Sequence, residues 1–560
     1  MEPGPTQPDP AGSTPPPAWP PGTTPPSGPA SPAPGDTPEP ARGRSLVVDL
    51  LLGAGVIAIL AAVIFGVPAL TGGSAVPSPS PSAASVVPSS SLVAVAPSTV
   101  ASAVPSLPSF DPAALPSPGT IPGGPFATSG AIVVQGSDGA LTVVGADGRA
   151  TPIWPGGDST FFFPTWSPDG SRIALIRGNA SGGHEILLFD AKAALAGEVK
   201  APVTLLRSGS IGPFYLAWTP DGTSISYLAD DPSGLSFRIV KADGSAPIDG
   251  SAVGSTIRSG NPFYFDWIDQ SRVLAHIGAG PGAFLGEIGL DGAPVADPLG
   301  TPGDFRSAVV SRDHRFISFI RAGAGAASDV VLAARDGSGE RTMPVFGFAA
   351  TTFDPIGDRI SSIGPAAVSA TRFSIPIGPI RLLDAAGGAP RTLLDGNVVS
   401  DWWSPDGKTI AAIRVQPVGG DSAAPASSPV PSAPIAPSSP AEPSASAPPA
   451  GAPSAVPGGS AAASGSPAAS APPNEVRLLF VDVASGKIRS QLVVDPGQVF
   501  VDQFLTYFDQ YATSHRLWSP DSSSFVIPLF EPDGKTRIAI VRPDGGPAVK
   551  ILGDAAFWSP

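Results

Sequence analysis

The chain has 560 residues, a formal net charge of −14 and no cysteine. Without cysteine it has no disulfide bond, no thiolate metal site and no cysteine nucleophile. Because no cluster of lysine and arginine is present to neutralise phosphates, the sequence also argues against nucleic acid as a partner.

Residues 1–44 form a block rich in Pro, Ser and Ala, and we predict a disordered cytoplasmic tail there. Such a tail is either a ligand for a groove that binds Pro-rich peptides or a plain solvated segment. In either case the block lacks the apolar surface that a folded core requires.

Residues 45–70 contain an unbroken apolar run from Leu50 to Leu70. As a helix, these 21 residues would span roughly 31 Å, the thickness of a hydrocarbon core. Arg42 and Arg44 precede the run and no charge follows it before Asp111, so the positive-inside rule places the N-terminus in the cytoplasm. A cleaved signal peptide is the alternative, although the run exceeds the usual ~7–15 apolar residues. We expect a single-pass cell-membrane anchor with the following residues extracytoplasmic.

Two further Pro/Ser/Ala-rich blocks lie beyond the anchor. Residues 71–124 are predicted to be a disordered stalk, and residues 416–474 a disordered insertion in a surface loop of the folded part. The remaining chain, 125–560, is rich in residues that favour strands. The preference for Arg over Lys, together with abundant Ala, Gly and Pro, is typical of a GC-rich bacterial genome.

One motif recurs through residues 160–560. A repeat at a regular period is the strongest indication of fold class in a sequence, so it is considered before other signals. It reads Trp-Ser/Thr-Pro-Asp followed by an alternating strand, with clear copies at 166, 218, 403 and 518, degenerate copies at 267, 310 and 353, and a last partial copy at 558. Apart from the interval that holds the insertion, the copies are 40–52 residues apart. This spacing is typical of the blades of a β-propeller.

The residues of the repeat predict a four-stranded unit. A strand ends at the Trp, Pro and Asp then favour a tight turn, Gly supplies positive φ, and three more short strands follow. Residues 130–155 supply three strands without an inner partner, and residues 553–560 supply the strand that would close the ring. We predict an all-β propeller of about eight blades, or alternatively seven, closed by pairing of N- and C-terminal strands.

The Trp-Ser-Pro-Asp-Gly turn with its alternating strand resembles the TolB-type, WD-like propeller repeat. The match is specific in 166–170, 218–222, 403–407 and 518–521 and weak in the degenerate copies. The resemblance implies a propeller that binds a protein, peptide or glycan, often in the cell envelope, and it names no particular ligand.

Few residues indicate chemistry. The motif residues Asp169, Asp221, Asp406 and Asp521 are interpreted as turn residues rather than as a ring of carboxylates. The four histidines lie in different repeats without zinc-site spacing, and His314 takes the Gly slot of a turn. We therefore predict no catalytic residue, no metal site and no cofactor.

The connection 496–515 is the longest between predicted strands, and it carries Phe504, Tyr507, Phe508, Tyr511 and His515. It is either a partner-binding loop at the propeller mouth or a plug that covers the channel with its aromatic side chains.

Three functions fit this sequence. The first is a non-catalytic binding module held outside a membrane. The second is an enzyme on an envelope glycan whose site is built from scattered loop carboxylates, and the third is an anchor whose function lies in the tail. A propeller-gated hydrolase would need a G-x-S-x-G elbow, which the sequence does not contain.

Overall fold

The structure, a computed structural model, describes residues 110–121 and 130–560 with gaps at 158–159, 179–182, 210, 232–233, 245–247, 250–255, 281, 304–305, 307, 325–326, 356, 366–374 and 419–473. The predicted tail, the run Leu50–Leu70 and most of the predicted stalk and insertion lie outside these residues. Within the described ranges, no helix is both long and apolar enough to cross a membrane.

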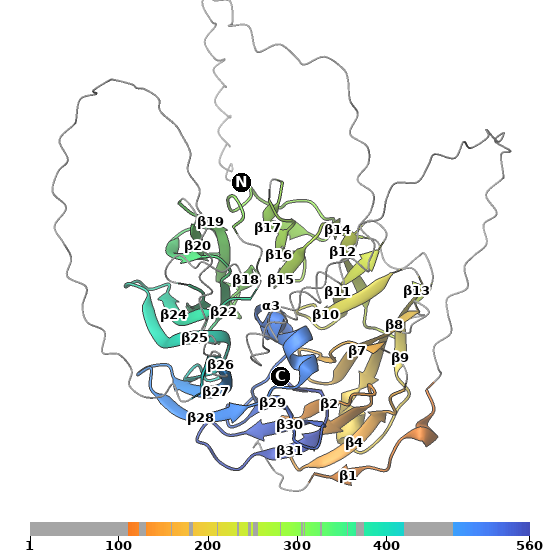
Figure 1. Cartoon of the computed structure of the whole chain (residues 1–560). Coiled ribbons are helices and arrows are strands. Elements are labelled where there is room, and N and C mark those ends of the chain that lie inside the picture. Colours follow the sequence, from red (N-terminus) through yellow and green to blue (C-terminus); the bar gives the residue numbers. More distant parts are fainter. Residues whose placement is uncertain are drawn as a thin grey trace, which may run out of the picture. The chain divides into compact units, whose positions relative to one another are not determined.

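The described residues form an all-β fold of mainly antiparallel sheets, in which most paired strands are consecutive in the chain (Figure 1). The first sheet has the order β1-β4-β3-β2-β32, with β1 (Gly119–Thr120), β2 (Ile132–Gln135), β3 (Leu141–Val144), β4 (Arg149–Trp154) and β32 (Ala555–Trp558). The second contains β5 (Thr160–Phe161), β6 (Thr165–Trp166), β7 (Arg172–Gly178), β8 (His184–Asp190), β9 (Val203–Ser208) and β13 (Ile248–Asp249), with the short helix α2 (Ala191–Leu195) after β8.

Three sheets follow in chain order. They comprise β10 (Gly212–Trp218), β11 (Ser224–Asp231), β12 (Gly234–Lys241) and β14 (Arg258–Ser259); then β15 (Phe263–Asp269), β16 (Arg272–Ile277) and β17 (Phe284–Gly289); then β18 (Val309–Val310), β19 (Phe316–Ala322), β20 (Ala327–Ala334) and β21 (Arg341–Phe346).

The sixth sheet has seven strands because one long strand belongs to two units. These are β22 (Ala350–Phe353), β23 (Arg359–Ile363), β24 (Gly378–Asp384), β25 (Arg391–Trp403), β26 (Thr409–Pro417), β27 (Asn474–Asp482) and β28 (Ile488–Val494). The first part of β25 pairs with β24 and the last part with β26, so each half of the sheet has four strands. The last sheet contains β29 (Phe525–Phe530), β30 (Thr536–Val541) and β31 (Val549–Leu552).

Strands at the ends of neighbouring sheets contact one another, as β15 does with β18, β18 with β22 and β29 with β32. The sheets therefore surround a common centre, the arrangement of a β-propeller (Figure 1). Near the C-terminus, β32 pairs with β2 in the register Ile132↔Trp558 to Gln135↔Ala555, which is the pairing expected for the last eight residues.

At three copies of the motif, the Trp joins its unit to the one before it. The indole N–H of Trp166 donates to the Phe557 carbonyl at 3.0 Å, that of Trp218 to the Thr165 carbonyl at 3.3 Å, and that of Trp518 to the Trp402 carbonyl at 3.0 Å. A buried indole needs a partner for its N–H, and here the partner lies on the neighbouring sheet. The motif Trp is therefore both a core side chain and a bond between sheets.

The interpretation of the motif aspartates as turn residues is confirmed. Asp169 accepts from the Ser167 hydroxyl at 2.6 Å and from the Ser171 backbone N–H at 3.1 Å, and the same two bonds recur at Asp221, Asp406 and Asp521. These hydrogen bonds, from Ser167 first, lower the pKa of Asp169 to about 2. At the degenerate turn, His314 adopts φ +58°, so it takes the backbone conformation of the Gly that it replaces.

Two predicted boundaries need correction. Residues 110–121 were expected to belong to the stalk. Instead, Phe110 stacks on Trp154 at 5.7 Å and β1 pairs with β4. The segment joins the first sheet because its aromatic ring can pack there and its backbone N–H and C=O groups can pair with β4. The insertion was expected to begin at 416 and end at 474, yet β26 continues to Pro417 and β27 begins at Asn474, where the two strands pair. The side-chain amide of Gln416 also donates to Glu475 at 3.1 Å across these strands.

Candidate binding site

The predicted aromatic loop forms three consecutive short helical segments, η3 (Phe500–Phe504), η4 (Leu505–Tyr507) and α3 (Phe508–Ser514). A separate short helix, η1 (Pro112–Ala114), lies near the start of the described chain. The helix α3 contacts β10, β15, β22 and β25, which belong to three different sheets (Figure 1). These residues therefore lie at the common centre of the sheets, and we call 500–514 the plug.

The five predicted site residues lie together, but they differ in exposure. Phe504 and Phe508 are fully buried, His515 is buried, Tyr511 is half-buried, and Tyr507 is 46% exposed. Of the five, Tyr507 is thus the residue that solvent, and hence a partner, can reach most readily. The prediction that this loop binds a partner therefore rests mainly on Tyr507.

The buried aromatics hold the plug in the centre. Trp402 lies 6.2, 6.4 and 5.9 Å from the rings of Phe500, Phe504 and Phe508. Phe504 also stacks on Tyr511 at 4.9 Å. These rings pack against the sheets and not toward solvent. Such packing is what we expect if the loop covers the channel with its aromatic side chains.

Polar contacts hold the other side of the plug. Arg306 donates to the Thr506 carbonyl at 3.2 Å and lies 3.6 Å from the Asp509 carboxylate, with both charged side chains buried. The Tyr215 hydroxyl lies 3.1 Å from the Ser514 hydroxyl, and burial raises the pKa of Tyr215 to about 12. Burial also lowers the pKa of His515 to about 3, so this imidazole is neutral and uncharged at pH 7.

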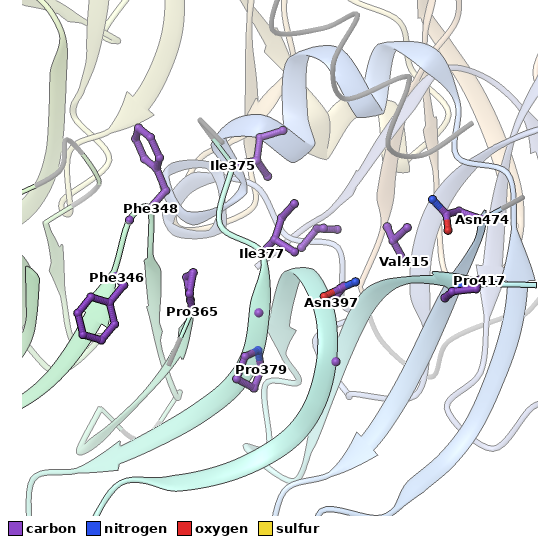
Figure 2. A pocket seen from close by; sticks show the side chains of 14 residues that line it. Phe346, Phe348, Pro365, Ile375, Ile377, Pro379, Asn397, Val415, Pro417 and Asn474 are labelled. Carbon is purple, nitrogen blue, oxygen red and sulfur yellow. The ribbon is translucent and has the colours of Figure 1, made fainter. Parts of the chain in front are cut away.

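A pocket of ≈ 630 Å³ opens beside the plug, between the fifth and sixth sheets (Figure 2). Its apolar wall consists of Phe346, Phe348, Ile375, Ile377, Val399 and Val415, with Pro365, Pro379 and Pro417. Gly347, Gly378, Gly396 and the side-chain amides of Asn397 and Asn474 complete it. The volume lies within the roughly 300–1,000 Å³ of ordinary ligand sites.

The pocket forms where strand pairing is irregular. The register between β24 and β25 shifts on both sides of Ile380, and that between β25 and β26 shifts after Val398. Such bulges bend a strand and redirect its side chains, which separates neighbouring strands at this end of the sheet. None of the lining residues in the described part of the chain carries an ionisable side chain.

Phe348 connects the pocket to the plug. Its ring lies 5.6 Å from the guanidinium carbon of Arg306, the residue that also contacts Thr506 and Asp509. This distance is typical of a cation–π contact. The same guanidinium also forms the ion pair with Asp509 of the plug. One buried arginine therefore touches both the pocket wall and the central helix.

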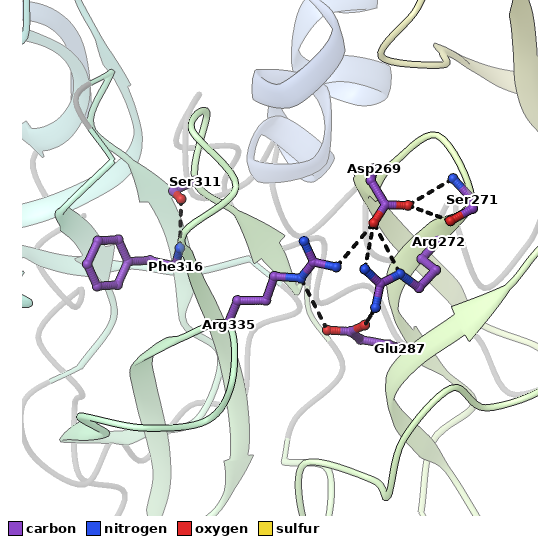
Figure 3. A network of polar contacts seen from close by, with 7 residues as sticks. All are labelled: Asp269, Ser271, Arg272, Glu287, Ser311, Phe316 and Arg335. Atoms are coloured by element: carbon purple, nitrogen blue, oxygen red, sulfur yellow. Dashed lines mark hydrogen bonds and ion pairs between the residues drawn. The ribbon is translucent and has the colours of Figure 1, made fainter. Parts of the chain in front are cut away.

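A cluster of four charged side chains lies elsewhere, between the fourth and fifth sheets (Figure 3). Asp269 accepts from Arg272 at 2.7 Å and from Arg335 at 3.1 Å, and Glu287 pairs with the same two arginines at 3.1 and 3.9 Å. Burial raises the pKa of Glu287. Since both carboxylates face two arginines, this network holds two sheets together and offers no free acid or base.

Among the residues that the structure describes, no three His, Asp or Glu side chains gather closely enough to hold a metal ion. The absence of a cofactor and of catalytic residues remains a prediction.

The sequence did not reveal the pocket. Its residues come from strands and turns between 346 and 474, and no spacing in the chain relates Phe348 to Asn397 or Asn474. The local signal was the Pro-rich segment predicted from 416 to 474, which indicated a loop and not a binding site.

No protein-family model matches this chain, and no curated protein matches it. Solved structures similar to it include a putative TolB from Agrobacterium tumefaciens, at 19% identity and a TM-score of 0.29, covering 50% of this chain and 96% of that one. An oligogalacturonate lyase from Vibrio parahaemolyticus has 9% identity and a TM-score of 0.35, covering 52% and 89%. Prolyl oligopeptidase B from Galerina marginata has 11% identity and a TM-score of 0.40, covering 71% and 51%. Likenesses this remote leave the function open, and the fold described above rests on the strand pairing itself.

Proposed function

We propose that this chain is a membrane-tethered, extracytoplasmic propeller that acts as a non-catalytic binding or scaffolding module for a protein, peptide or envelope glycan. The tether is supported by the apolar run Leu50–Leu70 and by Arg42 and Arg44 before it. The Pro-rich residues between the run and the sheets would hold the propeller away from the membrane surface.

We also propose that the propeller has eight blades of the TolB type and that β2 and β32 close the ring. In support, the six sheets other than the sixth would each provide one blade and the sixth would provide two, because β25 belongs to both of its halves. Bonds from the motif Trp residues to the preceding unit, including Trp166 to Phe557 beside the C-terminus, fit the same ring.

The observation that carries the binding function is the pocket wall itself, whose described residues are Phe, Ile, Val, Pro and Gly with two Asn. General acid–base catalysis needs a titratable side chain within hydrogen-bond reach of the reacting atoms, and glycoside hydrolysis needs two carboxyl groups that flank the bond. The lining residues that the structure describes offer neither, whereas a largely apolar wall suits reversible binding.

The test is a capture experiment with the full chain and a native envelope extract, compared with the Phe346→Ala variant. We expect the wild-type chain to retain a discrete component that the variant retains several-fold less, and mass spectrometry to detect no altered product. If an envelope glycan or peptide is instead converted with turnover, the alternative of a propeller enzyme takes its place, with a site built from carboxylates outside the pocket.

A further inference from the structure

We infer that the plug, residues 500–514, is a pH-dependent latch, which packs tightly while the Asp401 carboxyl group holds a proton and loosens when that proton is lost. Its effect would be to make access to the centre of the propeller depend on pH. The inference does not depend on the proposed binding function. It is carried by two buried carboxyl groups, one on the surrounding sheet and one on the plug, at a point where the two pack together.

The two carboxyl groups lie at the contact between α3 and β25. Asp509 follows Phe508 at the start of α3, and Asp401 precedes Trp402 near the end of β25. The rings of Phe508 and Trp402 lie 5.9 Å apart, and α3 contacts both β25 and β22. Asp401 and Asp509 are each only 1% exposed, so bulk water solvates neither of them.

Hydroxyl groups of two neighbouring strands hold Asp401 in place. Its Oδ2 accepts from the Ser361 hydroxyl of β23 at 2.6 Å and from the Thr352 hydroxyl of β22 at 3.2 Å. Ser361 in turn accepts from the indole N–H of Trp403 at 2.9 Å. These bonds orient the carboxyl group, but they bring it no positive charge. Because a buried charge is costly unless an opposite charge pairs with it, the protonated form of Asp401 is favoured at this position.

Asp509 has a positive partner of its own. Its carboxylate lies 3.6 Å from the guanidinium of Arg306, and arginine is charged throughout pH 5 to 8. The phenols of Tyr215 and Tyr264 also lie near Asp509. Burial raises the pKa of Tyr215 to about 12 and that of Tyr264 well above its ordinary value, so both phenols stay neutral in this range. An ionised Asp401 would therefore place a second negative charge beside a single ion pair.

Loss of the Asp401 proton should weaken the contact between plug and sheet. Burial first, and the charge of Asp509 in addition, raise the pKa of Asp401 to about 6, against the hydrogen bonds from Ser361 and Thr352. A loosened plug would admit water and return this pKa toward its ordinary value of 3.8. Between these two values the packed plug binds the proton and the loosened plug does not, so the packed state loses stability as pH rises. From pH 5 to pH 7.5 the loosened state should gain by up to about tenfold.

The test is hydrogen–deuterium exchange of the full chain at pH 5 and pH 7.5, with each measured rate divided by the intrinsic exchange rate at that pH. This ratio reports how often the plug opens. We expect the protection of residues 500–514 to be several-fold lower at pH 7.5 than at pH 5, with a limit of about tenfold.

The matched variants are Asp401→Asn and Asp266→Asn, each of which replaces a carboxyl group of raised pKa with a neutral amide. Asp266 is a demanding control, because its charge acts on Tyr215, whose hydroxyl lies 3.1 Å from that of Ser514 in the plug. We expect Asp401→Asn to give the plug the same protection at both pH values. We expect Asp266→Asn to keep the difference seen in the wild-type chain.

Three results would overturn the latch. The first is equal or greater protection of the wild-type plug at pH 7.5, a result that needs no variant and holds even if Asp401→Asn does not fold. The second is a pH difference that persists in Asp401→Asn. The third is a difference that disappears in Asp266→Asn, which would assign the response to Asp266 instead.

Discussion

Arg306 and Asp509 form a buried ion pair at the centre of the propeller, with 3.6 Å between nitrogen and oxygen and side chains that are 3% and 1% exposed. Asp509 belongs to α3 and Arg306 to the segment between β17 and β18, so the pair joins the plug to the surrounding sheets. Removing one member of such a pair leaves the other charge buried without its partner.

Asp509→Asn should therefore lower the free energy of unfolding by about 3 kcal/mol, as measured by urea denaturation. The double variant Arg306→Met with Asp509→Leu should recover much of this loss, because neither charge then remains. The control, Asp533→Asn, removes one member of the exposed pair with Arg537 and should change the stability little. A double variant less stable than Asp509→Asn would contradict this account.

Phe348→Ala should loosen the plug from a distance. The exchange removes the ring that lies against Arg306, so the guanidinium gains freedom and its contacts with Thr506 and Asp509 weaken. Hydrogen–deuterium exchange of residues 500–515 should become several-fold faster. Phe346→Ala provides the control, because Phe346 is half-buried in the same pocket whereas the cation–π contact with Arg306 belongs to Phe348. Equal exchange in both variants would refute the connection.

Asp266 predicts a pH dependence of stability. Asp266 is half-buried, and desolvation of its carboxyl group raises its pKa to about 7 despite hydrogen bonds from the backbone N–H groups of Val310 and Trp267. Between its unfolded pKa near 3.8 and about 7, the folded state binds the proton and the unfolded state does not, so this group's contribution to stability falls as pH rises.

Asp266→Asn removes that titration. The difference in free energy of unfolding between the variant and the wild-type chain should shift in favour of the variant by on the order of 2 kcal/mol when the pH is raised from 5 to 8. Urea denaturation at the two pH values measures the difference. Asp221→Asn is the control: its hydrogen bond from Thr219 lowers the pKa of Asp221, so its effect should be the same at both pH values. A difference at Asp266 that does not change with pH would show that the carboxyl group titrates normally.

Gly170→Ala tests the repeated turn. Gly170 has φ +69°, a conformation that costs a residue with a Cβ roughly 1 kcal/mol, while the added methyl would meet only ordinary contacts with Pro560. The variant should lose about 1 kcal/mol in thermal or urea unfolding. Gly119→Ala, where no atom lies within 4 Å of the added carbon and φ is not positive, should be nearly neutral.

The local chemistry of this protein was readable from its sequence. The Trp-Ser-Pro-Asp-Gly repeat predicted an all-β propeller, because Pro, Asp and Gly specify a tight turn from their own backbone preferences and hydrogen bonds. The turn roles of Asp169 and His314 followed in the same way, and so did the pairing of residues 555–558 with the strand at 132. These are properties of short segments, or of a period that counting can find.

Only the tertiary structure decided where side chains distant in the chain meet. The sequence identified the aromatics of 504–511 but could not tell a partner-binding loop from a plug, because that choice depends on the size of the space enclosed by the sheets. It gave no sign that Arg306 lies between Phe348 and Asp509, nor that Asn397 and Asn474 share a pocket. Such contacts depend on the combined effect of strand registers and bulges in several units. The conformational preferences of short segments do not determine them.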